Sequence, residues 1–85
     1  MYTVQWLQTA LDELTDLWVQ AESSSRQAIT AATHQIDRQL TADPSDAGES
    51  RADDRRILFE SPLAVDFRVL PNAAIVEILH VWRYA

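Results

Sequence analysis

The chain opens with a hydrophobic period of two. Tyr2, Val4 and Trp6 alternate with polar residues, which predicts a short β-strand with one buried face. From Thr9 onward, apolar residues recur every three or four positions, which is the period of an amphipathic α-helix. We expect Thr9 to be the N-cap, because its hydroxyl can accept a hydrogen bond from a free amide of the first turn. The apolar face of this helix comprises Ala10, Leu11, Leu14, Leu17, Trp18 and Ala21.

Three serines, Ser23 to Ser25, interrupt the first helix and predict the start of a second one. The apolar stripe of the second helix comprises Ile29, Ala32, Thr33, Ile36 and Leu40. Two helices joined by so short a break predict an antiparallel helical hairpin. Residues 41–54 then shift to Asp, Ser, Pro and Gly with almost no large apolar side chain, which predicts a surface loop.

Three further strands are predicted in the C-terminal half, over residues 56–60, 63–70 and 75–82. Together with the first strand they give an α+β fold of order β-α-α-β-β-β. In this fold a helical hairpin packs on one face of a small, mainly antiparallel four-stranded sheet. At this length we expect a single domain over residues 1–85.

Two helices cover only one face of such a sheet, so the opposite face needs a partner or another cover. On the last strand, alternation places Ile75, Leu79 and Val81 on the uncovered face. An exposed apolar patch of this kind is typical of a protein-binding surface. The alternative is that the long loop or the second helix folds over it. Trp82 is either a core residue or an anchor for a partner, because aromatic residues dominate interface energetics.

The composition excludes several kinds of active site. The 85 residues include no Cys, seven Arg but no Lys, and a single Gly. Disulfide scaffolds, thiolate zinc sites, cysteine nucleophiles, Schiff-base lysines and glycine-rich phosphate loops are therefore excluded. The formal net charge of −6 argues against tight binding to DNA or RNA, which requires a surplus of basic groups. No apolar run reaches the roughly 20 residues of a membrane span and no signal peptide is recognisable, so a cytoplasmic protein is expected.

Few residues suggest metal or acid–base chemistry. His34 and His80 each lack a second ligand at metal-binding spacing, so we expect no metal site and no cofactor. The acidic pairs Asp12-Glu13 and Asp53-Asp54 are interpreted as solvated charge. Trp18 belongs to the apolar stripe of the first helix and is expected in the core.

The order and spacing of several segments resemble the RelE/ParE superfamily of type II toxin–antitoxin systems. The matching segments are Tyr2-Thr3-Val4-Gln5-Trp6, Ala10, Asp12-Glu13-Leu14, Ile36, Leu40, Asp43-Pro44, Gly48, Arg51, Arg56-Ile57-Leu58, Phe67-Arg68-Val69 and the closing run from Val76 to Arg83. The resemblance implies a compact toxin that a small antitoxin neutralises by wrapping its C-terminal segment around it. One branch of the superfamily cleaves messenger RNA on the ribosome, and the other inhibits DNA gyrase.

The sequence departs from the RNA-cleaving branch. Members of that branch carry lysines on the second strand, an arginine early in the third, and arginine plus tyrosine near the C-terminus. Here the second strand has Arg56 but no Lys, and the third-strand position is Ala64. The resemblance therefore leaves Arg56, Arg83 and Tyr84 as catalytic candidates if the chain is a ribonuclease.

Three functions remain open. A gyrase-type toxin that acts by binding is favoured, because the charge is −6 and lysines are absent. A ribosome-dependent endoribonuclease and a non-toxic interaction module are the alternatives. Arg68 is a candidate for contact with an acidic group of the antitoxin, whereas the structural alternative is that Arg56 and Arg68 pair across strands with Glu60, Asp66 or Glu77.

Overall fold

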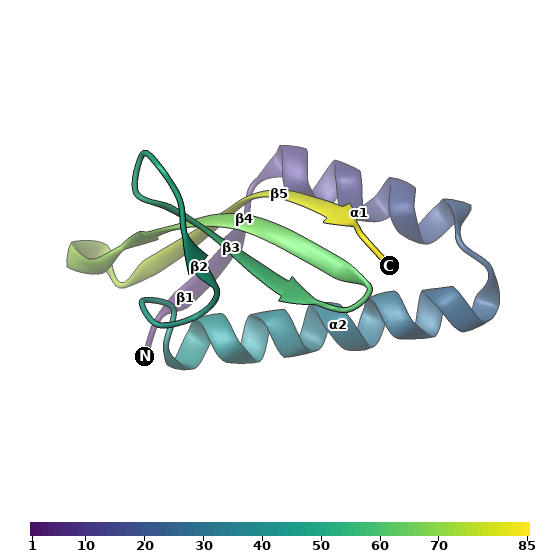
Figure 1. The fold of residues 1–85 in the computed structure, drawn as a ribbon, viewed down its shortest axis with the longest axis horizontal. Helices are drawn as coiled ribbons and strands as arrows, with labels where there is room; N and C mark the ends of the chain where they lie inside the picture. Colours follow the sequence, from purple (N-terminus) through teal and green to yellow (C-terminus); the bar gives the residue numbers. More distant parts are fainter.

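The computed structural model describes all 85 residues as two helices packed on one mixed sheet (Figure 1). The elements are β1 (Thr3–Trp6), α1 (Gln8–Gln20), α2 (Ser23–Ala42), β2 (Glu49–Ser50), β3 (Arg55–Glu60), β4 (Leu63–Leu70), a 3₁₀ turn (Pro71–Ala73) and β5 (Ile75–Arg83). The strand order across the sheet is β1-β5-β4-β3-β2. Strand β1 runs parallel to β5, and every other pair is antiparallel. The predicted α+β class and helical hairpin are therefore confirmed.

The sheet has five strands rather than the predicted four. The additional strand, β2, lies within the predicted loop and pairs through Glu49 and Ser50 with β3. Gly48 permits this pairing, since it has a φ of +67° and a Cβ there would lie 2.2 Å from the carbonyl oxygen of Ile57. Arg56 reinforces the contact by donating to the carbonyl oxygens of Ala47 and Gly48 at 2.8 and 3.1 Å.

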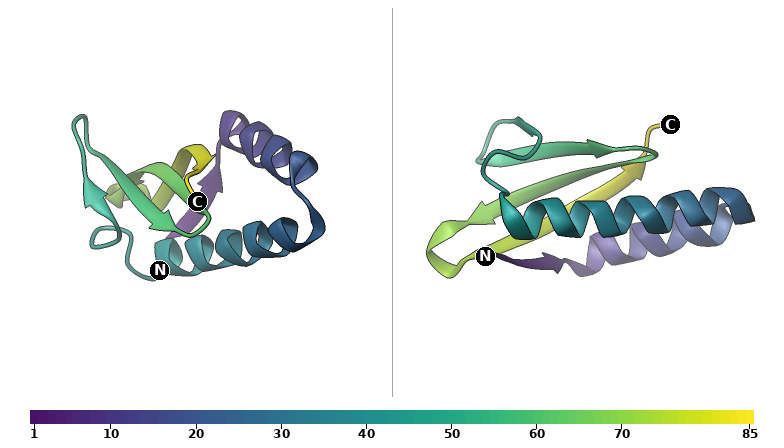
Figure 2. Two further views of the ribbon diagram at one scale, coloured as in Figure 1. Left: turned by 45° about the vertical axis from the view of Figure 1, so that its right-hand side comes forward. Right: turned by 90° about the horizontal axis from the view of Figure 1, so that it is seen from below.

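Both helices lie on the same side of the sheet (Figure 2). Helix α2 packs against β1, β3 and β4, whereas α1 packs mainly along β5. The predicted stripe of α2 is almost wholly buried, and it joins the inward residues of three strands. The buried apolar core comprises Ala10, Ile29, Ala32, Ile36, Leu40, Leu58, Leu63, Val65, Phe67, Val76, Ile78 and Val81. We call the opposite side of the sheet, which no helix covers, the far face.

Helix α1 is less buried than its stripe predicts. Of the stripe, only Ala10 is fully buried, while Leu11 and Trp18 are exposed. The prediction that Trp18 is a core residue is therefore wrong. The reason is that α1 lies beside β5 at the point where β1 ends, so only a narrow strip of its surface meets the sheet. The helix also begins at Gln8, and Thr9 makes no capping hydrogen bond.

A β-bulge changes which side chains of β5 face the helices. Phe67 is opposite Ile78 and Asp66 is opposite His80, so one residue of β5, Leu79, has no partner in the register. Beyond the bulge the alternation is reversed. Val81 therefore lies in the core, 3% exposed, and the prediction that it is on the uncovered face is wrong. Neither helix combines the length and hydrophobicity that crossing a bilayer requires.

Candidate functional site on the far face

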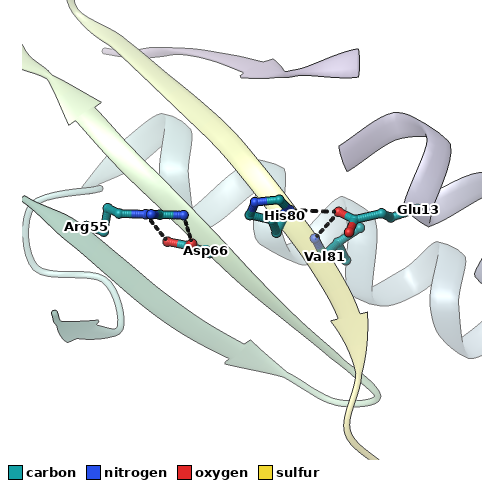
Figure 3. Close-up of polar contacts among 5 residues, drawn as sticks. All are labelled: Glu13, Arg55, Asp66, His80 and Val81. Atoms are coloured by element: carbon teal, nitrogen blue, oxygen red, sulfur yellow. Dashed lines mark hydrogen bonds and ion pairs between the residues drawn. The ribbon is translucent and has the colours of Figure 1, made fainter. Parts of the chain in front are cut away.

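Two arginines lie side by side on the far face, each paired with a carboxylate of a neighbouring strand. Arg55 on β3 binds Asp66 on β4 through two hydrogen bonds (Figure 3). Arg68 on β4 binds Glu77 on β5 through its Nε and Nη2 atoms, at 3.1 and 2.6 Å. Because Arg55 and Arg68 are register partners, the two ion pairs form one continuous cluster. The predicted pairing of Arg68 across strands is thus confirmed for Glu77.

His80 lies next to this cluster and is held from α1. The Oε1 atom of Glu13 is 3.3 Å from Nδ1 of His80 and accepts a hydrogen bond from the backbone N–H of Val81 at 3.2 Å (Figure 3). That N–H has no partner on β1, since the pairing of β1 with β5 ends at Trp6. Glu13 is therefore not a purely solvated charge, as the sequence suggests, but joins α1 to the sheet.

These side chains line a shallow cleft of about 370 Å³ on the far face. The β2–β3 turn contributes Asp53, the residue before α1 contributes Leu7, and the first turn of α1 contributes Thr9. The full lining is Leu7, Thr9, Asp53, Arg55, Arg68, Leu79 and His80. The turn and the start of α1 thus close two sides of a cleft whose base is the sheet.

The charges around the cleft do not suit a polyanion. Each arginine is paired with its own carboxylate, which leaves Asp53 and Glu13 as additional acidic side chains beside His80. Phosphate recognition requires free arginine or lysine donors. The cleft therefore offers an imidazole and paired guanidinium groups, but no net positive field.

An aromatic surface adjoins the cleft at one end of the far face. Phe59, Ala64 and Trp82 lie in one row across β3, β4 and β5. The rings of Phe59 and Tyr84 meet edge to face, with centroids 5.1 Å apart. Phe59, Trp82 and Tyr84 are 46%, 36% and 47% exposed, so these three rings are open to solvent, whereas Ala64 between them is buried. We call Phe59, Trp82 and Tyr84 the aromatic end of the far face.

The structure separates the three catalytic candidates that the sequence suggests. Arg56 points toward the helix side and is bound to loop carbonyl oxygens. Arg83 donates to the carbonyl oxygen of Ala85 and lies 3.5 Å from the hydroxyl of Ser25. Tyr84 lies at the aromatic end. The three side chains therefore do not form one site.

Four of the five residues predicted to bind a partner lie on the far face. These are Arg68, Ile75, Leu79 and Trp82. The fifth, Val81, is in the core, as described above. Arg55 and the contact between Glu13 and His80 are site features that the sequence does not predict. Arg55 is detectable in principle, because it continues the alternation of Ile57 and Phe59, whereas a contact across 67 residues has no local signal.

A second cleft lies between the two helices. It has a volume of about 270 Å³ and is lined by Leu14, Thr15, Trp18, Ile29, Thr30, Thr33 and His34. Arg26 stacks on Trp18 at 4.4 Å and donates to the carbonyl oxygens of Trp18 and Val19, so it closes the end of α1 against α2. No group of three or more acidic, histidine or cysteine side chains converges as a metal site would require.

No protein-family model matches the sequence, and no curated protein is similar to it in sequence. Solved structures are similar in fold. A chain from the chromosomal ParDE toxin–antitoxin system of Pseudomonas aeruginosa has a TM-score of 0.78 at 20% identity, covering 100% of this chain and 98% of its own. A chain from the RelBE2 toxin–antitoxin complex of Mycobacterium tuberculosis has a TM-score of 0.79 at 20% identity, covering 99% and 92%.

The isolated RelE toxin of Escherichia coli has a TM-score of 0.68 at 17% identity, covering 100% of this chain and 86% of its own. That structure contains the toxin without an antitoxin. From β1 to β5, this chain has the RelE/ParE fold.

Proposed function

We propose that this chain is the toxin of a type II toxin–antitoxin system, that it inhibits growth in the cytoplasm by binding a large protein target such as DNA gyrase, and that a cognate antitoxin neutralises it. The observation that supports a toxin is the similarity of the whole chain to RelE and to chains of the ParDE and RelBE2 systems. Stabilisation of a plasmid or chromosomal segment would follow from such a pair.

The charge of the far face supports action by binding rather than by RNA cleavage. Stabilising the transition state of phosphodiester cleavage requires positive groups free to meet the developing charge. Arg55 and Arg68 are both committed to carboxylates, and the chain contains no lysine that could replace them. A protein target has no such requirement.

A ribosome-dependent endoribonuclease is the second candidate, because one observation favours it. His80 lies in the same cleft as Arg55 and Arg68, and Glu13 holds one of its ring nitrogens. A histidine oriented by a carboxylate is suited to general acid–base catalysis. His80, rather than Arg56, Arg83 and Tyr84 together, is then the residue to test.

The far face is the surface that we assign to partner binding. It combines the aromatic end with Arg68, Ile75 and Leu79, and neither helix packs across it. Aromatic and arginine side chains provide most of the binding energy in protein interfaces. An antitoxin that covers this face would prevent the target from binding, because both partners would contact the same residues.

Expression of the chain without its antitoxin separates the functions. A toxin of either kind stops growth on induction, whereas a non-toxic interaction module has no effect. Plasmid DNA from arrested cells then loses negative supercoiling if gyrase is the target. New messenger RNA cut sites in primer-extension mapping, with supercoiling unchanged, would instead establish the ribonuclease.

The role of the C-terminal residues is tested in the same cells. Arg83→Ala combined with Tyr84→Phe removes a guanidinium group and a hydroxyl but preserves the aromatic contact with Phe59. Because these residues lie apart from the cleft, we expect toxicity to be retained. Complete loss of toxicity in a folded double variant would instead show that Arg83 or Tyr84 is required for toxicity.

A further inference from the structure

The two carboxylates that bind the far-face arginines are less exposed than the arginines themselves. The side chains of Asp66 and Glu77 are 16% and 19% exposed, compared with 38% for Arg55 and 45% for Arg68. The carboxylates therefore lie at the base of the cluster and the guanidinium groups lie above them. Without Asp66 and Glu77, two cationic groups would face solvent side by side.

We propose that Asp66 and Glu77 are specificity-determining residues, which keep single-stranded RNA and other polyanions out of the cleft so that it remains available to a protein partner. This inference rests on the proposed function, because it explains how the cleft would be reserved for a protein target rather than for RNA. Specificity of this kind requires groups that disfavour the wrong ligand as well as groups that favour the right one.

The geometry explains how two residues have this effect. Both Nε and Nη2 of each arginine donate to a carboxylate oxygen, and these donors form the planar fork that would otherwise bind a phosphate. A phosphate would have to displace a carboxylate whose position is fixed by a β-strand. Asp53 and Glu13 add two further negative charges at the edge of the cleft.

The test uses two neutral substitutions that preserve shape. Asp66→Asn and Glu77→Gln, made together, raise the formal charge of the chain from −6 to −4 and remove the negative charges that compensate both guanidinium groups. The matched control is Asp16→Asn with Asp46→Asn, which gives the same charge of −4. Asp16 and Asp46 are exposed, lie outside the cleft and make no ion pair.

The measurement is fluorescence anisotropy of a labelled single-stranded RNA of about 16 nucleotides at about 0.05 M salt. We expect the Asp66/Glu77 variant to bind at least tenfold more tightly than the original chain and than the control. The slope of log K against log salt should steepen by about 1.4, because each newly neutralised phosphate contributes about 0.7 for a single strand.

A third variant establishes that the arginines are responsible. Adding Arg55→Gln and Arg68→Gln to the Asp66/Glu77 variant should abolish the gained affinity. Circular dichroism establishes that each variant is folded, and Asp66→Asn and Glu77→Gln can be tested singly if the double variant is not. A gain of less than twofold, an equal gain in the control, or a gain that survives loss of both arginines would each overturn the proposal. Since purified protein is used, failure here is distinguishable from a failure to stop growth.

Discussion

Glu13 provides the most informative test of how α1 is attached to the sheet. Its Oε1 atom accepts a hydrogen bond from the backbone N–H of Val81, with an N···O distance of 3.2 Å, and Val81 is 3% exposed. Replacement by Ala leaves that donor without a partner, because β1 ends too early to reach it. An unsatisfied buried donor costs about 1–3 kcal/mol, and the higher helix propensity of Ala returns less than about 0.7 kcal/mol.

We therefore expect Glu13→Ala to lower the free energy of unfolding by about 1–2 kcal/mol. For a chain of this length, that is a decrease in Tm of about 4–8 °C per kcal/mol. The contribution of the His80 contact is small, since both side chains are partly exposed and exposed pairs contribute about 0–1 kcal/mol. Glu13→Gln preserves an acceptor oxygen, so this variant should lower the free energy of unfolding clearly less than Glu13→Ala does.

Urea unfolding followed by tryptophan fluorescence measures these differences. Asp16→Ala, an exposed carboxylate on the same helix, is the control and should change stability by less than about 0.5 kcal/mol. If Glu13→Ala is no more destabilising than Asp16→Ala, the N–H of Val81 does not depend on Glu13 and the assigned role is refuted.

Three backbone and capping positions give further predictions, each measured by urea unfolding. Ala74 has a φ of +54°, so Ala74→Gly should increase stability by about 0.5–1 kcal/mol; a decrease would show that this turn is not strained. Gly48→Ala should destabilise by about 2–4 kcal/mol, because the new Cβ meets the carbonyl oxygen of Ile57, and a neutral effect would contradict the β2 pairing. Arg26→Ala should cost about 1–2 kcal/mol by removing two hydrogen bonds to the last turn of α1, and wild-type stability would exclude that cap.

The elements of this fold are predictable where one face of an element is buried by neighbours of regular geometry. Helix α2 crosses the sheet, so its apolar stripe of Ile29, Ala32, Ile36 and Leu40 coincides with the core. Strand β4 is central in the sheet, and its inward residues Leu63, Val65 and Phe67 alternate without interruption. In both elements, local periodicity and tertiary burial agree.

The remainder depends on contacts that no local pattern contains. The bulge at Leu79 reverses the alternation of β5, so the face of Val81 cannot be derived from a period of two. Strand β2 has only two residues, and it depends on Gly48 and Arg56 rather than on hydrophobic alternation.

The candidate site is less predictable than the fold. Its members come from α1, the β2–β3 turn, β3, β4 and β5, and only the register of the strands brings them together. The sequence predicts that Arg68 lies on the far face, because it follows the inward-facing Phe67 on the same strand and successive side chains alternate between the two faces. Glu13 and His80 belong to different elements that are 67 residues apart in sequence, so their contact becomes evident only in the folded chain.

The central claim is that the far face, rather than the helix side, is the surface through which the chain acts. Two tryptophans allow a matched comparison, since Trp82 is 36% exposed on the far face and Trp18 is 43% exposed on α1. The measurement is colony formation after induction of the chain alone, of Trp82→Ala and of Trp18→Ala, with circular dichroism confirming that each is folded. We predict that the original chain and Trp18→Ala stop growth and that Trp82→Ala does not. If Trp82→Ala still stopped growth and Trp18→Ala no longer did, the result would contradict the account.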